Sequence, residues 1–418
     1  MFHRLSDNIL FLFLFMLIFG ILLYGFIGFD YTDELCALGL FSIFGIYLFT
    51  TPHWSFNKSF LFTIGIFIFY ICYSFYIRSN TQIAILADAT VQIKPYLAFF
   101  CIYSMMPQLN DRQKKLLQSV CLLCWIILIP IGIAGAINEQ TLRMTMGHPA
   151  YFAAAVTCLS LTYLYCSKFS INEKIIFIVM LALGILSGRS KFYGFFTFSF
   201  FVIFYFSAIK QFKLNLKNGI ILTLMIIVML FVAWKKIDLY FYHAMTSVDE
   251  SEKDMIARYV LYATFPQILT DYFPFGSGFA SFGTFYSGAY YSNIYVEYGI
   301  DNVWGMTKNH YNFVADTFYP SLAQFGIIGI LLYLFFWIYI LKKAIQYNKK
   351  VQNKKYISIA LMIIGFFAIE GTTDSTFTTH RGFYVLMLLG LILSDLKNLY
   401  IEKTAVDKKA FEDEKISK

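Results

Sequence analysis

The feature that most constrains this chain is a series of long apolar segments. One of them, Ile9–Phe29, contains no charged residue, and a helix needs about 20 apolar residues to span a bilayer. Charged residues make up only 14% of the chain, against about 25% in soluble proteins, which excludes a water-soluble globular protein. Barrel strands would instead alternate in polarity over about ten residues. The sequence therefore predicts an all-α polytopic membrane protein.

The apolar segments between charged breaks predict twelve membrane helices. They lie near residues 9–29, 34–50, 60–77, 95–107, 116–137, 149–167, 174–188, 192–209, 218–234, 321–341, 356–369 and 382–394. The fourth is expected to begin at Pro95, because Gln82–Gln92 is semi-polar and proline is favoured in the first helical turn. The predicted regions are helices one to nine (1–234), one large loop (235–320), helices ten to twelve (321–394) and a charged, solvated tail (395–418).

Lysine predicts which side of the membrane each loop faces. Most lysines fall in alternate loops and in the C-terminal tail, and the positive-inside rule places such segments in the cytoplasm. Both termini are therefore expected to be cytoplasmic. The large loop between helices nine and ten is then expected on the outer face of the membrane.

Arginine has the opposite distribution. Five of the seven arginines fall in predicted outer segments, where topology does not favour positive charge. A guanidinium group binds phosphate through a planar pair of donors, so phosphate binding is one interpretation. The other is that these arginines pair with outer acids such as Asp88, Glu139 or Glu297.

The first candidate motif is Ser187-Gly188-Arg189-Ser190-Lys191, at the outer end of the seventh predicted helix. The following hairpin is short, so both cations are expected near the headgroup level. An arginine costs roughly 2–3 kcal/mol at the centre of the bilayer and less toward the interface. We interpret Arg189, with Lys191, as binding a lipid-linked phosphate. The alternative is that both side chains snorkel to headgroups.

The second motif places Arg258 in a predicted amphipathic helix, 253–269, lying at the outer surface. Arg258 is expected to point from this helix toward a cavity in the membrane region. Gly276 and Gly278 follow it in the sequence, and they predict a tight turn at which backbone can approach a ligand.

The third motif is Lys308-Asn309-His310-Tyr311-Asn312, followed by Asp316 close to the start of the tenth helix. A neutral imidazole can accept a proton or orient a hydroxyl group near physiological pH. His310 and Asp316 are therefore alternative candidates for a catalytic base.

Four further residues are candidates for secondary contacts with a substrate. Asp374 and Arg381 lie between the last two predicted helices, with Glu370 and His380, where they either complete the cavity or form a solvated turn. His148 opens the sixth helix, and a helix start favours anions. Arg143 lies five residues before it.

In their order along the chain, these motifs resemble the bacterial superfamily of O-antigen ligases and O-antigen or capsule repeat-unit polymerases. The resemblance extends over most of the chain and includes the single large outer loop. The motifs that carry it are Ser187-Gly188-Arg189-Ser190-Lys191, Arg258, Gly276-Ser277-Gly278-Phe279-Ala280-Ser281-Phe282-Gly283, Asp316-Thr317-Phe318-Tyr319-Pro320 and Ala323-Gln324-Phe325-Gly326-Ile327-Ile328-Gly329.

The resemblance implies a C-type glycosyltransferase architecture and transfer of glycan from undecaprenyl diphosphate at the periplasmic face of the inner membrane. It implies no cofactor and no obligatory metal. The diphosphate-binding arginines of the family correspond by position to Arg189 and Arg258, and the loop histidine that assists the acceptor corresponds to His310. The implied partners are the undecaprenyl-diphosphate-linked oligosaccharide, membrane lipids and, as a candidate, a chain-length regulator; nucleic acid is not expected.

Within this superfamily, the motif before the tenth helix favours one activity. Ligases typically carry a His-Asn pair there, whereas this chain has Asn309-His310 and then Asp316-Thr317-Phe318-Tyr319-Pro320, which resembles repeat-unit polymerases. We predict an inverting polymerase whose acceptor is the non-reducing end of another lipid-linked repeat unit. A ligase that transfers the glycan to lipid A core is the alternative. A transporter or flippase is disfavoured, because it would place polar groups at the midplane of broken helices.

Overall fold

The structure is a computed structural model, and it describes residues 2–28, 31–51, 57–208 and 253–416, with residues 220, 223, 224 and 227 in addition. These parts of the chain are helical and contain no β-strand. The prediction of an all-α protein is confirmed for them.

The helices of the first half are connected by short turns. They are α1 (Phe2–Phe15), the π-helical η1 (Met16–Leu22), α2 (Tyr24–Ile27), α3 (Thr32–Thr50), α4 (Lys58–Ile77), α5 (Gln82–Met105), α6 (Asp111–Ile137), α7 (Glu139–Met146), α8 (Pro149–Cys166), α9 (Ile171–Ala182), the 3-10 turn η2 (Leu183–Ser187), α10 (Ser190–Phe204) and the 3-10 turn η3 (Phe206–Ala208).

The second half combines short helices with three long ones. They are α12 (Lys253–Asp271), α13 (Phe285–Ala289), α14 (Ile294–Glu297), α15 (Phe318–Ser321), the 3-10 turn η6 (Leu322–Phe325), α16 (Gly326–Val351), α17 (Lys354–Glu370), the 3-10 turn η7 (Thr376–Thr378) and α18 (His380–Ile416).

Eight helical segments of the described residues are long and apolar enough to cross a membrane. They are Leu5–Leu22, Thr32–Thr50, Lys58–Ile77, Gln82–Met105, Asp111–Ile137, Pro149–Cys166, Phe318–Val351 and His380–Lys408. Each overlaps one of the twelve predicted spans. The chain is therefore a polytopic helical membrane protein.

The remaining four predicted spans have different outcomes. α10 is apolar but shorter, and α9 with η2 and α17 occupy the predicted spans 174–188 and 356–369. The predicted ninth span, 218–234, lies almost wholly outside the described residues. The total of twelve stays a prediction.

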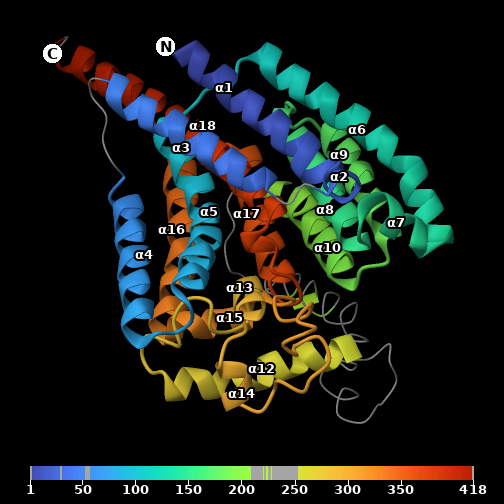
Figure 1. Cartoon of the computed structure of the whole chain (residues 1–418). Helices are drawn as coiled ribbons and strands as arrows, with labels where there is room; N and C mark the ends of the chain where they lie inside the picture. Colours follow the sequence, from blue (N-terminus) through green and yellow to red (C-terminus); the bar gives the residue numbers. More distant parts are fainter. Residues whose placement is uncertain are drawn as a thin grey trace.

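The long helices form one bundle with inner and outer members. α8 is the innermost, with 89% of its span buried, whereas α4 is peripheral, with 17% buried. The outer helices expose large apolar side chains such as Phe62 and Leu123, as expected where lipid is the solvent. Figure 1 shows the start of α1 and the end of α18 at one end of the bundle, and α12 to α15 at the opposite end.

The fourth helix corrects the prediction that Pro95 begins it. α5 starts at Gln82, where the Thr81 side chain accepts a hydrogen bond from the backbone N–H of Ala84, and Pro95 lies inside the helix. Packed membrane helices tolerate internal proline because neighbouring groups satisfy the freed carbonyl.

The semi-polar start of α5 is helical because its polar side chains have partners elsewhere in the chain. The buried Asp88 carboxylate accepts a 2.7 Å hydrogen bond from the backbone N–H of Ala280. Lys94, also buried, pairs with Asp33 at 2.5 Å and with Glu34, both on α3. These contacts offset the cost of burying charge, and hydropathy alone does not reveal them.

The predicted loop has a small hydrophobic core of its own. α12 forms where the amphipathic helix was predicted, and its buried side chains Ala257, Leu261 and Ile268 pack against other segments of the loop. The partners that complete this core are Phe282, Ile294, Tyr295, Ile300, Met306, Val314 and Ala323. The described part of the loop is therefore a folded unit attached to the end of the bundle.

The glycine turn has a different role from the predicted one. Gly276 and Gly278 have positive φ angles of 81° and 84°, as a tight turn requires. Their backbone approaches protein rather than a ligand cavity, because the Gly278 N–H donates to the Gln324 carbonyl at 2.8 Å. Gly276 in turn lies directly against Gly326. The turn fastens the loop to the start of α16.

The C-terminal charged segment is also more ordered than predicted. α18 continues past the expected end at residue 394 and runs to Ile416. The buried Asp395 carboxylate accepts hydrogen bonds from Tyr165 at 2.8 Å and Tyr356 at 3.2 Å, and it pairs with Lys114. These contacts hold the first charged residue of the predicted tail inside the bundle.

The Gly276–Gly326 contact predicts an asymmetry between two Gly→Ala substitutions. A Cβ atom at Gly276 would lie 2.2 Å from the Gly326 nitrogen, whereas one at Gly299, which also has a positive φ, meets nothing within 4 Å. We expect Gly299→Ala to cost about 1–2 kcal/mol from backbone strain and Gly276→Ala about 2–5 kcal/mol, because overpacking adds to it. Thermal unfolding of the purified variants in detergent measures both; equal losses would contradict this reading.

Candidate functional site

A cavity of about 1460 Å³ lies at the end of the bundle that carries α12 to α15. Its wall combines bundle and loop: the starts of α8, α10 and α18, the end of α17, and residues from α5 and α12. Arg258 of α12 and Arg189, the N-cap of α10, both line it. The two arginines that the sequence predicts as diphosphate ligands thus face one hollow.

The cavity gathers nearly all the predicted site residues. Those that line it are Arg143, His148, Arg189, Lys191, Arg258, Asp316, Asp374 and Arg381. These residues come from separate segments of the sequence, and the fold brings them together at one end of the bundle.

His310 is the predicted site residue that the cavity does not include. Its side chain is exposed, and its ring lies against that of Trp304 with centroids 5.2 Å apart. Its backbone N–H donates to the Thr307 side chain in a tight turn. Of the two predicted candidates for a base, only Asp316 faces the arginines.

Arg258 and Asp316 form a close ion pair on the loop side of the cavity. Their side-chain atoms Nη2 and Oδ2 are 2.5 Å apart, and each side chain is about one-quarter exposed. Burial raises the pKa of Asp316 above its usual value, although Arg258 opposes that shift. The pair therefore combines a cation for an anionic ligand with a carboxylate of increased basicity.

Arg189 and His148 meet on the bundle side of the cavity. The Arg189 Nη2 atom lies 3.0 Å from the His148 Nε2 atom. Burial lowers the pKa of His148 to about 4, and the nearby cations Arg189 and Arg143 add to the effect. The imidazole is therefore neutral at physiological pH and accepts a hydrogen bond through one of its two ring nitrogens. Its Nδ1 atom lies 3.2 Å from the backbone nitrogen of Ala150 at the start of α8, and its Nε2 atom faces the guanidinium.

The alternative interpretation of the outer arginines, pairing with acids, also holds for four of the five, because each lies within 4 Å of a carboxylate: Arg258 near Asp316, Arg381 near Asp374, and Arg189 and Arg143 near Glu139. Arg143 lies 2.9 Å from Glu139, one helical turn earlier on α7, and both side chains are more than half exposed. Arg189 lies 3.9 Å from the same carboxylate. An exposed pair of this kind contributes about 0–1 kcal/mol and leaves the cation available to a stronger anion.

Lys191 belongs to a buried network that joins three helices. Its Nζ atom lies 2.6 Å from Glu370 at the end of α17 and 3.0 Å from Asp374. Asp374 also accepts two hydrogen bonds from Arg381 at the start of α18. Asp374 and Arg381 complete the cavity wall, Glu370 is buried beside them, and the group is not a solvated turn. The charge of Lys191, predicted to bind diphosphate, is already balanced by two carboxylates.

The arrangement of the network keeps Asp374 ionised. Burial by itself would raise the pKa of this carboxyl group, but Arg381 and Lys191 overcome it, so the pKa lies below its usual value. Arg381 also rests on the face of Tyr151, with the guanidinium carbon 4.5 Å from the ring centroid. The network therefore fixes the relative positions of α8, α10, α17 and α18 beside the cavity.

The cavity wall also has an aromatic part, which is not among the predicted site residues. Tyr259 and Tyr262 of α12, Tyr286 of α13 and Tyr319 of α15 all line the cavity. Tyr262 lies one helical turn after Arg258, so helical spacing alone could have identified it. The other positions depend on how the loop folds. Aromatic faces and hydroxyl groups of this kind are suited to packing against sugar rings.

Among the described residues, no group of three or more His, Cys, Asp and Glu side chains is placed to hold a metal ion. No protein-family model matches the chain, and no curated protein matches it in sequence.

The buried network predicts a large cost for removing its central acid. Asp374→Asn leaves Arg381 and Lys191 with less negative charge in a buried position, and breaking a buried pair in this way costs about 3–5 kcal/mol. Glu139→Gln removes a carboxylate from an exposed pair and is expected to cost about 0–1 kcal/mol. Chemical unfolding of both variants in the same detergent compares them. Similar, small losses would show that the network is not a stabilising element.

Proposed function

We propose that this protein is a glycosyltransferase that uses a lipid-diphosphate-linked glycan as donor and extends a second lipid-linked repeat unit. One feature carries the proposal: Arg189 and Arg258 line a single cavity of about 1460 Å³ in a membrane protein. The volume is large enough for a diphosphate and several sugar residues. The tyrosines along the same wall suit the glycan part.

The reaction needs positive charge where the leaving group departs. A hydroxyl oxygen of the acceptor sugar forms a bond to the anomeric carbon, and the bond from that carbon to the diphosphate oxygen breaks with both electrons. Negative charge then develops on the diphosphate. Fixed guanidinium groups in a site shielded from water stabilise such charge strongly. Arg189, which comes from the bundle, and Arg258, which comes from the loop, are the groups that we assign to this task.

The hydroxyl proton needs an acceptor, and Asp316 is the better of the two predicted candidates. It lines the cavity and pairs with Arg258, whereas His310 does not line it. When a diphosphate shares the charge of Arg258, the carboxylate loses part of its stabilising partner and becomes more basic. Donor binding would thereby activate the base. Direct displacement of this kind inverts the anomeric configuration.

The acceptor distinguishes a polymerase from a ligase, and both would share this donor chemistry. The sequence around Asp316-Thr317-Phe318-Tyr319-Pro320 favours a repeat-unit polymerase. Incubating purified protein with one defined undecaprenyl-diphosphate repeat unit tests this. A ladder of longer glycans with released undecaprenyl diphosphate is the expected product. Transfer to lipid A core in place of a ladder would assign the ligase activity.

Replacing either arginine in the cavity tests the leaving-group assignment. We expect Arg189→Ala and Arg258→Ala each to slow polymer formation by about 10²–10³, the usual effect of losing one contact to a developing oxyanion. Arg78→Ala is the matched control, because Arg78 is exposed and does not line the cavity. Near-normal rates in both cavity variants, at normal protein levels, would exclude the proposed mechanism.

The two candidate bases give opposite expectations. Asp316→Asn removes the proton acceptor while keeping nearly the same shape, so we expect a loss of about 10²–10⁴ in the single-turnover rate. His310→Ala should keep most of the activity, because its ring contacts Trp304 outside the cavity. The reverse pattern would assign the base to His310 and would require the loop to move when substrate binds.

A further inference from the structure

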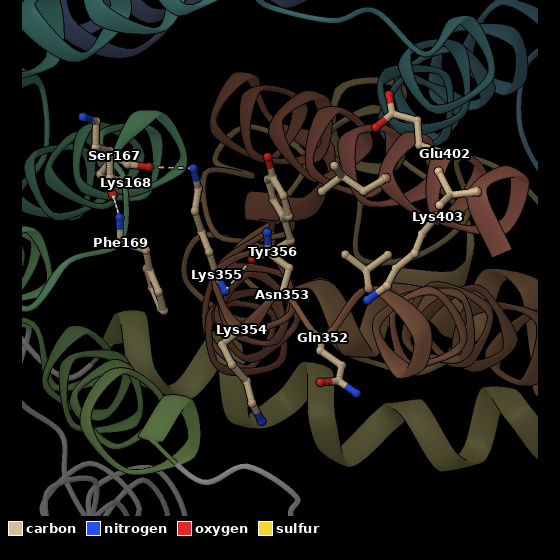
Figure 2. Close-up of a pocket in the computed structure, with 13 residues that line it drawn as sticks. Ser167, Lys168, Phe169, Gln352, Asn353, Lys354, Lys355, Tyr356, Glu402 and Lys403 are labelled. Carbon is tan, nitrogen blue, oxygen red and sulfur yellow. Dashed lines mark hydrogen bonds between the residues drawn. The ribbon is translucent and has the colours of Figure 1, made fainter. Parts of the chain in front are cut away.

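Figure 2 shows a second hollow, of about 750 Å³. It lies at the opposite end of the bundle from the arginine cavity, because α8, α17 and α18 reach both. Residues 150, 369 and 381 line the cavity, whereas residue 167, just after α8, and residues 355 and 403 line this hollow. We call it the lysine pocket. Its wall consists of Ser167, Lys168, Phe169, Val351, Gln352, Asn353, Lys354, Lys355, Tyr356, Leu399, Glu402, Lys403 and Val406.

The charges around this pocket are unbalanced. Four lysines and one glutamate line it, and within the described parts of the chain none of the four lysines forms a salt bridge. Nearby lysines at the same end behave differently, since Lys114 pairs with Asp395 at 3.2 Å and Lys350 with Asp407 at 2.8 Å. The wall of the pocket therefore carries a net positive charge.

Two of these lysines stand where a helix favours anions. Lys354 and Lys355 occupy the first turn of α17, which contains no acidic residue, and the helix dipole makes this a site for negative charge. The position of Lys355 is explained by a contact within the protein. Its Nζ atom donates a 2.7 Å hydrogen bond to the carbonyl of Ser167, at the end of α8. Figure 2 shows Lys354 extending in the other direction. Its Nζ atom lies 5.3 Å from the centroid of the Phe206 ring, and no carboxylate among the described residues forms a salt bridge with it.

The pocket also has an apolar side. Phe169, Val351, Leu399 and Val406 line it together with the lysines, and Val406 is 67% exposed. A ligand that fits both parts of the wall carries an anionic group next to hydrocarbon. A free phosphate ion would use only the polar part, whereas an anionic phospholipid would use both.

We propose that the lysine pocket binds the phosphodiester headgroup of an anionic phospholipid, from the leaflet at the end of the bundle where both chain termini lie. Ammonium groups near a membrane surface attract anionic lipid by about 1 kcal/mol each. Bound lipid would bridge α8, the α16–α17 turn and α18. This site is separate from the cavity of the proposed function, and neither proposal depends on the other.

A photoreactive phosphatidylglycerol tests the site in the full-length protein. The protein is placed in phosphatidylcholine nanodiscs with increasing fractions of a phosphatidylglycerol that carries a photoreactive group beside its headgroup. Crosslinks are then mapped by mass spectrometry of peptides. We expect saturable labelling of the α18 segment around Lys403, with the half-saturating fraction about 25-fold higher in the Lys354→Gln, Lys403→Gln double variant, about fivefold for each charge.

The control variant removes two lysine charges at the same end of the bundle but outside the pocket. Lys342 and Lys349 of α16 are exposed and do not line the pocket, so Lys342→Gln, Lys349→Gln should leave the labelling unchanged. The Lys354→Arg, Lys403→Arg variant should retain it, and matching unfolding temperatures show that all variants fold. Equal weakening in the control would overturn the proposal. The proposal would also be overturned if inorganic phosphate reduced the lipid labelling more than chloride does at equal ionic strength, because the ligand would then be a free anion.

Discussion

Charges buried among membrane helices must have partners close by, and one network of such charges organises the end of the bundle that holds the cavity. Lys191, Glu370, Asp374 and Arg381 connect the start of α10, the end of α17 and the start of α18. Removing two charges from water costs several kcal/mol for each ion, and only close opposite charges offset it. The helix ends are therefore fixed relative to one another, and the cavity between them has a defined shape.

That network divides the cations of the cavity into two kinds. Lys191 and Arg381 hold the wall together, and their charges are balanced by carboxylates inside it. Arg189 contacts the His148 imidazole and lies 3.9 Å from Glu139, and Arg258 pairs with Asp316 at the cavity surface. Their side chains are 31% and 24% exposed, against 14% for Lys191 and 5% for Arg381. The cations inside the wall and those at the cavity surface are thus close in space yet differ in burial.

The sequence predicts the general architecture well because hydropathy depends on local composition. Eight of the predicted spans coincide with apolar helices, and α12 forms where an amphipathic helix was expected. The errors occur where polar residues find distant partners. Asp88 and Lys94 make the start of α5 look unsuited to a membrane helix, but Ala280 and Asp33 satisfy them.

The candidate site was predictable in part for the same reason. Motif order and the placement of arginine identified Arg189 and Arg258, since both features can be read along the chain. The balanced state of Lys191 depends on Glu370, which is far away in sequence, and the exclusion of His310 depends on how the loop folds around Trp304. No local pattern contains that information.

The close contact between Gly276 and Gly326 has a consequence for evolution as well as for folding. It joins the folded loop, which carries Arg258, to the start of α16 at a point where no side chain fits. Exposed parts of the loop can change in length and composition without altering how it meets the bundle, provided that this contact keeps its shape. Sequence change in the loop is therefore constrained most strongly at these two glycines.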